Sequence, residues 1–137
     1  MKNAFVLRGV GNSGKTTTIS KQFYPLFKQN YPDLIEVYRD PRKKIELIVV
    51  VEVDGVLIGI TSLGDTVDYV QKCLDIFLDH GCEIIVCATK SDGETVATLE
   101  KIKPDFQVEY VKKIKDANDD AEVAQLILNS VQTLLRT

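Results

Sequence analysis

Apolar residues along the chain fall into two patterns: short continuous runs, and longer segments in which they recur every three or four positions. The short runs are typical of buried strands, and the longer segments are typical of helices that pack on one face. The predicted strands are Ala4–Leu7, Ile45–Val53, Val56–Ile60, Glu83–Ala88 and Phe106–Val111. The predicted helices are about Lys15–Lys28, Thr66–His80, Glu94–Ile102 and a last helix capped by Asn118 or Asp119. This alternation favours an α/β fold with a mostly parallel sheet and helices on both faces.

Turn-forming and helix-breaking residues refine this order. Asp54 and Gly55 separate two runs rich in Val and Ile, and a two-residue Asp-Gly loop favours a type I′ hairpin. The strand Ile45–Val53 is therefore expected to run antiparallel to the others, at an edge of the sheet. Pro25 falls inside the first helical pattern and is expected to kink or split that helix near Tyr24.

Composition narrows the class of protein. The chain has 137 residues, which predicts a single domain spanning residues 1–137. Its 17 Lys and Arg against 20 Asp and Glu give a net charge of −3, which does not favour non-specific nucleic-acid binding. No apolar run approaches the roughly 20 residues that cross a bilayer, so no membrane association is expected. Cys73, Cys82 and Cys87 form no Cys-x-x-Cys pair, and they favour buried thiols in a cytoplasmic protein.

One motif carries most of the chemical information. Residues 9–16 fit the pattern G-x-x-x-x-G-K-[ST], between a predicted strand and a predicted helix. Glycines let successive backbone N–H groups point at an anion, and the helix start adds its positive end. Lys15 would neutralise β- and γ-phosphates, and the Thr16 hydroxyl would complete the shell of a Mg²⁺ ion. The predicted nucleotide-binding residues are Gly9, Gly11, Asn12, Ser13, Gly14, Lys15, Thr16 and Thr17.

The motif and its flanking elements resemble those of the P-loop NTPases (Walker A proteins), without selecting a subfamily. The resemblance implies a three-layer α/β/α domain with a five-stranded, mostly parallel sheet and one antiparallel edge strand. With the predicted strands numbered along the chain, the implied order is 2-3-1-4-5. The implied function is Mg²⁺-dependent binding of a nucleoside triphosphate, with ATP favoured, followed by hydrolysis or phosphoryl transfer.

Members of that superfamily usually carry an acidic residue just beyond a strand that neighbours the loop strand. Here Val56–Ile60 is followed by Thr61, Ser62, Leu63 and Gly64, and Asp65 is the first acidic residue. Asp65 is therefore the candidate for holding the metal or orienting water, and it is also a candidate helix N-cap. The hydroxyls of Thr61 and Ser62 are candidates for contacts to the γ-phosphate or to metal-bound water, the alternative being an ordinary polar loop.

The sequence contains two basic clusters, and the predicted strand order indicates where each one lies. The densest spans residues 39–44 and precedes the antiparallel strand, so it is expected at the loop end of the sheet. There Arg39 or Arg42 would stabilise charge on a transferring phosphoryl group, the alternative being a solvated charged loop. The run containing Lys112, Lys113 and Lys115 is expected to be a solvated strand end or loop.

The string Thr89-Lys90-Ser91-Asp92 is similar to the [NT]-K-x-D guanine-recognition motif of the P-loop GTPases. That resemblance implies base contacts from Lys90 and Asp92. The favoured alternative is a capping box, in which Ser91 caps the next helix and Glu94 supports the cap.

Three classes of function stay open. The first is a small NTPase, with ATP favoured over GTP. The second is a small-molecule kinase with an unknown acceptor. The third is a nucleotide-binding regulatory protein without turnover, acting through an unknown protein partner.

Overall fold

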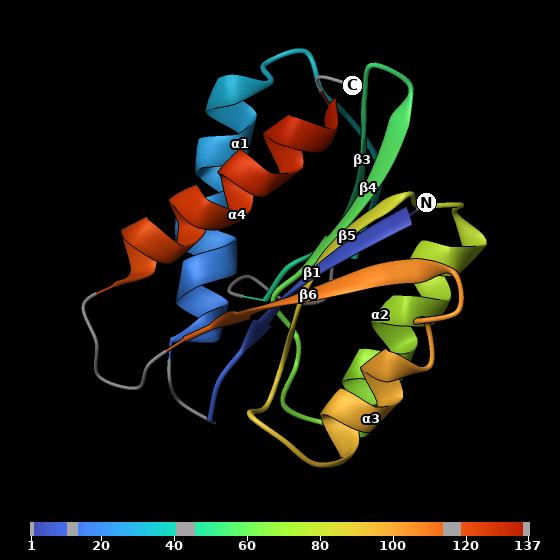
Figure 1. Cartoon of the computed structure of the whole chain (residues 1–137). Coiled ribbons are helices and arrows are strands. Elements are labelled where there is room, and N and C mark those ends of the chain that lie inside the picture. Colours follow the sequence, from blue (N-terminus) through green and yellow to red (C-terminus); the bar gives the residue numbers. More distant parts are fainter. Residues whose placement is uncertain (1, 11–13, 41–45, 114–118, 136–137) are drawn as a thin grey trace.

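The computed structural model describes residues 2–10, 14–40, 46–113 and 119–135. Within them, six strands form one mixed sheet in the order β2-β3-β4-β5-β1-β6 (Figure 1). The strands are β1 (Lys2–Arg8), β2 (Ile35–Arg39), β3 (Ile48–Val53), β4 (Val56–Thr61), β5 (Ile84–Thr89) and β6 (Phe106–Lys112). The α/β class is therefore confirmed.

The strand number and order differ from the prediction. In the described part, β2 is an additional strand, and β5 lies between β4 and β1, where the expected order put those two side by side. The antiparallel strand is β3, as the hairpin predicted, but it is second from the edge because β2 pairs with its outer side. Strand β2 was missed because its sequence contains no continuous apolar run. It is an edge strand whose side chains are mostly exposed, and its pairing with β3 is irregular between Glu36 and Tyr38.

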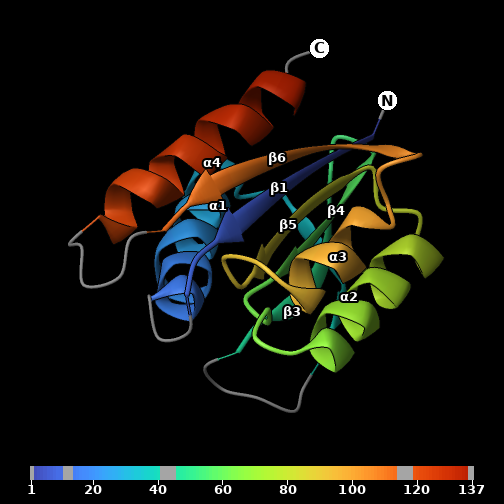
Figure 2. The same ribbon diagram turned by 60° about the horizontal axis from the view of Figure 1, so that its bottom comes forward.

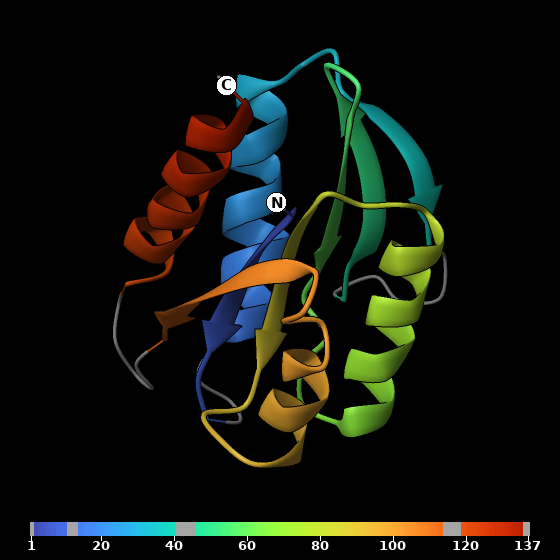
Figure 3. The ribbon, with the colours of Figure 1, turned by 45° about the vertical axis from the view of Figure 1, so that its right-hand side comes forward.

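Helices cover both faces of the sheet (Figures 2 and 3). The π-helix η1 (Thr17–Phe23), α1 (Tyr24–Asn30) and α4 (Asp120–Leu135) pack on one face. On the other face lie α2 (Val67–Asp79) and α3 (Glu94–Glu100). No helix in the described residues is long and apolar enough to cross a membrane.

Strand β1 contributes side chains to two hydrophobic cores, one on each face of the sheet. Alternate side chains of a strand point to opposite faces. Phe5 and Leu7 join the apolar cluster under η1, α1 and α4, while Ala4 and Val6 join the cluster under α2 and α3. All four are nearly or fully buried, as their continuous apolar run predicted.

Three local predictions are confirmed. Asp54 and Gly55 both have positive φ (51° and 83°), as a type I′ turn requires. The first helix changes register at Tyr24, where the π-helical segment gives way to α1 with Pro25 in its first turn. All three cysteines are buried and form no disulfide with one another, and burial raises the pKa of Cys82 to about 12.

Candidate functional site

The candidate site begins where β1 ends, between its two neighbouring strands. The Gly9 N–H donates to the Thr89 carbonyl oxygen at the end of β5, at 3.2 Å. On the other side, the Lys113 N–H donates to the Arg8 carbonyl oxygen at 2.8 Å. The glycine-rich loop therefore starts in the middle of the carboxyl edge of the sheet, where ligands bind in many open α/β folds.

The end of the loop requires glycine. Gly14 has φ +93°, a conformation that side chains disfavour, and its carbonyl oxygen accepts from the Thr18 N–H at 2.9 Å. Thr16 and Thr17 follow, both half-buried, in the first turn of the helix. Gly11, Asn12 and Ser13 lie outside the described residues.

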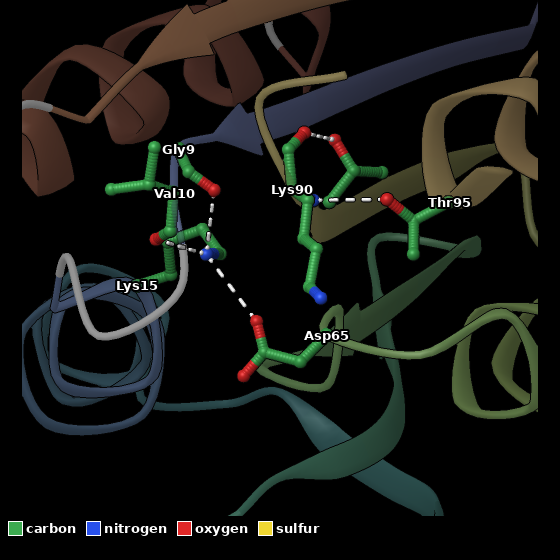
Figure 4. Close-up of polar contacts among 7 residues, drawn as sticks. Gly9, Val10, Lys15, Asp65, Lys90 and Thr95 are labelled. Atoms are coloured by element: carbon green, nitrogen blue, oxygen red, sulfur yellow. Dashed lines mark hydrogen bonds and ion pairs between the residues drawn. The ribbon is translucent and has the colours of Figure 1, made fainter. Parts of the chain in front are cut away.

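Lys15 lies with its side chain buried against the loop (Figure 4). Its amine donates to the carbonyl oxygens of Gly9, at 2.8 Å, and Val10, at 2.9 Å. The same nitrogen lies 3.4 Å from a carboxylate oxygen of Asp65, whose side chain is 59% exposed. Burial lowers the pKa of Lys15 below its usual value of 10.5, while the negative charge of Asp65 acts against that shift.

Asp65 lies in the segment that follows β4 (Val56–Thr61). Because β5 separates β4 from β1, this segment must cross the end of β5 to reach Lys15. Gly64 makes this crossing possible, because a Cβ there would lie 2.3 Å from the Ala88 carbonyl oxygen in β5. The predicted N-cap role of Asp65 is wrong: Thr66 caps α2, its hydroxyl accepting from the Tyr69 N–H at 3.2 Å. The carboxylate of Asp65 instead faces the loop.

The hydroxyls of Thr61 and Ser62 are both buried in the protein. The Ser62 hydroxyl accepts from the Leu47 N–H at 2.8 Å. The Thr61 hydroxyl accepts from the Leu63 N–H at 3.1 Å and contacts the Cys73 thiol at 3.3 Å. Both side chains hold the β4–α2 segment in shape, a role that the sequence alone did not reveal.

Lys90 lies beside Lys15 and Asp65, at the end of β5 (Figure 4). Its turn is fastened by the Thr89 hydroxyl, which donates to the Lys90 carbonyl oxygen at 2.9 Å, and by the Thr95 hydroxyl, which accepts from the Lys90 N–H at 3.1 Å. The Lys90 amine extends toward the space between Lys15 and Asp65, and its positive charge contributes to lowering the pKa of Lys15.

The predicted capping box is wrong. The N-cap of α3 is Gly93, at φ +85°, without a side-chain cap hydrogen bond. Because Gly93 supplies the turn through its own backbone freedom, Ser91 is not needed as a cap. Asp92 is exposed in the loop between β5 and α3, so its predicted base contact stays a prediction.

No protein-family model, curated protein or solved structure matches this chain.

Arg39 ends β2, at the carboxyl edge of the sheet but four strands away from β1. Its guanidinium pairs with Glu36 at 2.7 Å and lies 5.8 Å from the centre of the Tyr24 ring. Tyr24 in turn donates a hydrogen bond to Glu36. This cluster fastens the edge strand to α1, and Arg42 lies outside the described residues.

Lys113 is a residue of the site that sequence reasoning missed. It was expected to be solvated, but its side chain is only 1% exposed and pairs with Asp119 at 2.6 Å and Asp120 at 3.2 Å. Asp120 also accepts from the Thr18 hydroxyl at 3.0 Å, beside Gly14. The start of α4 is thereby tied to the first turn after the loop. The acidic residues after the lysine run were a signal, but only the strand order brings them to the loop.

Proposed function

We propose that the chain binds a nucleoside triphosphate together with Mg²⁺, ATP first among them, as a P-loop NTPase that hydrolyses it or transfers its terminal phosphoryl group. The observation that carries this proposal is the Lys15 amine, buried at the start of a helix and held by two loop carbonyl oxygens. A lysine in that place, after a glycine at positive φ, supplies positive charge where a phosphate chain would lie.

The residues around Lys15 fit a Mg²⁺ ion bound with the phosphates. Mg²⁺ prefers hard oxygen ligands, and it is usually held by one or two protein groups, phosphate oxygens and water. Thr16 offers a hydroxyl next to Lys15, and Asp65 offers an exposed carboxylate on the far side of the amine. When bound, the ion would neutralise charge on the phosphates.

The charges of the site suit the terminal phosphates. Lys15 and Lys90 are two cations near one carboxylate, Asp65. Lys15 would compensate charge on the β- and γ-phosphates, and Lys90 would meet the outermost oxygens. Asp65 would orient a water molecule or the metal shell. Three buried cysteines that form no disulfide with one another fit the cytoplasmic location that we also propose.

Thermal unfolding with a panel of ligands tests the proposal. ATP, GTP, ADP and GDP are added with and without Mg²⁺, because a ligand that binds only the folded state raises the melting temperature. We expect the largest rise with Mg²⁺ and ATP, and phosphate release measured in parallel separates an NTPase from a binding protein. A panel in which no triphosphate raises the melting temperature would contradict the proposal.

The metal arm of this test uses Thr16→Ala. Losing the hydroxyl is expected to remove most of the extra stabilisation that Mg²⁺ gives to ATP binding. Thr133→Ala is the matched control, because Thr133 is exposed on the surface of α4. It should show the same Mg²⁺ response as the wild type. An unchanged Mg²⁺ response in Thr16→Ala would remove Thr16 as a metal ligand.

A further inference from the structure

A pocket of about 510 Å³ opens at the carboxyl ends of β1 and β6. Its size falls in the range of small-molecule sites, roughly 300–1,000 Å³. Described residues that line it come from β1 and the loop, from β6, and from the segment after β5. They are Arg8, Gly9, Val10, Ser91, Tyr110, Lys112 and Lys113.

The pocket is continuous with the phosphate loop, and apart from Ser91, which follows β5, its described lining comes from β1, the loop and the β6 side of β1. Gly9 and Val10 belong to both, since their carbonyl oxygens hold the Lys15 amine while they also line the pocket. In the sheet, β5 and β4 lie on one side of β1 and β6 lies on the other. A ligand with its phosphates at Lys15 and its outer end at Asp65 would therefore extend its remaining part toward β6.

The chemistry of the pocket fits a flat ring attached to an anionic chain. The Arg8 guanidinium lies 5.1 Å from the centre of the Tyr110 ring, and Arg8 also donates to the Ser91 carbonyl oxygen, which fixes it in place. The pair offers a flat, delocalised surface of the kind on which bases stack. Among the described lining residues, the charged ones are Arg8, Lys112 and Lys113, of which Lys113 is paired with Asp119 and Asp120.

We propose that this pocket holds the base and ribose of the nucleotide, with the base stacked against the Arg8–Tyr110 pair. The triphosphate then runs past Gly9 and Val10 to Lys15 and ends between Lys90 and Asp65. In this orientation Lys90 belongs to the phosphate end of the site, and base contact comes from β1 and β6. The inference rests on the proposed nucleotide binding and adds the direction in which the ligand lies.

The test compares ATP with tripolyphosphate, which carries the same phosphates without a nucleoside. Both are titrated with Mg²⁺ by calorimetry into the wild type, Tyr110→Leu and Tyr110→Phe. Leucine keeps apolar volume on the strand but removes the flat ring, and phenylalanine keeps the ring. We expect ATP to bind the wild type more tightly than tripolyphosphate, and Tyr110→Leu to lose about tenfold or more of its ATP affinity. Tripolyphosphate affinity should be unchanged in both variants, and Tyr110→Phe should bind ATP within about twofold of the wild type.

The outcomes separate the two proposals. Equal wild-type affinities for ATP and tripolyphosphate, or an unchanged ATP affinity in Tyr110→Leu, would overturn the pocket assignment and leave the phosphate site standing. Equal losses for both ligands in Tyr110→Leu would show a structural role for the ring and would also overturn it. Absence of binding by both ligands in the wild type would instead overturn the proposed function. Thr133→Ala, an exposed position on α4, serves as a control outside the pocket and should bind ATP as the wild type does.

Discussion

At the scale of single residues, Lys15 is held in an environment that favours binding of an anion. Its amine is removed from water, which lowers its pKa, and two carbonyl oxygens and Asp65 compensate part of its charge. An incoming phosphate would supply the full negative charge that these neighbours supply only in part. Because the amine binds phosphate as a cation, affinity should fall as the pH rises through the pKa of Lys15.

Asp65→Asn tests this arrangement of charges. The Asp65 carboxylate acts to raise the pKa of Lys15, so its removal should lower that pKa further. NMR titration of the lysine side chains in the unliganded protein measures this directly. We expect Lys15 to lose its proton at lower pH in Asp65→Asn than in the wild type. Asp68 is an exposed residue in the first turn of α2, and in Asp68→Asn we expect Lys15 to titrate as in the wild type. The same Lys15 titration in Asp65→Asn as in the wild type would contradict the account.

The residues of the site could be predicted where their chemistry is local. Lys15 and Asp65 were both singled out from the sequence, one from its motif and one as the first acidic residue after a strand. Lys113 was misjudged because the acidic residues that follow it in the sequence do not by themselves show that its side chain is buried and paired with Asp119 and Asp120. Such contacts depend on which strands are neighbours in the sheet, and the spacing of apolar residues in the sequence does not determine the strand order.

At the scale of elements, the position of β5 explains why Asp65 lies several residues beyond the end of β4. Since β5 separates β4 from β1, the residues after β4 must cross the end of β5 before Asp65 can reach Lys15. The sequence showed that Asp65 is the first acidic residue after Ile60. The structure shows how the intervening segment crosses, because Gly64 lies directly on the backbone of Ala88.

Gly64→Ala tests the role of this crossing. The new Cβ would lie 2.3 Å from the Ala88 carbonyl oxygen, so the segment must shift. We expect a stability loss of about 1–3 kcal/mol by chemical denaturation and a lowered Lys15 pKa as Asp65 moves away. Gly55→Ala is the matched control, since its positive φ should cost about 1–2 kcal/mol in the distant hairpin without affecting Lys15. A Lys15 pKa that is unchanged in Gly64→Ala would contradict the role given to the crossing.

Turns and helix breaks could be predicted where one or two residues restrict the backbone conformation. The Asp54-Gly55 turn and the division of the first helix at Pro25 follow from backbone restrictions of single residues. Strand β2 was not predictable from an apolar pattern, because its side chains are mostly exposed and its pairing to β3 holds it in the sheet. The cap of α3 was misassigned because Gly93 supplies the turn by backbone conformation, whereas side-chain patterns point to Ser91.

At the scale of the whole molecule, the fold gathers distant cations at one edge of the sheet. The chain has a net charge of −3, yet Arg8, Lys15, Lys90 and Lys112 all lie at or near the carboxyl ends of β1, β5 and β6. The α/β class followed from the alternation of patterns, while the strand order that creates this edge did not. The proposed ligand spans the edge from the pocket at β6 to Asp65.

The most direct test of triphosphate binding is calorimetric titration of Mg²⁺ and ATP into the wild type, Lys15→Ala and Lys101→Ala. Lys101 is an exposed lysine at the end of α3 and controls for the loss of one positive charge. We predict saturable binding to the wild type and to Lys101→Ala, and at least a tenfold weaker affinity in folded Lys15→Ala, because a charged hydrogen-bond donor to the phosphates is lost. Equal affinities in all three proteins, or no binding to the wild type, would contradict the account.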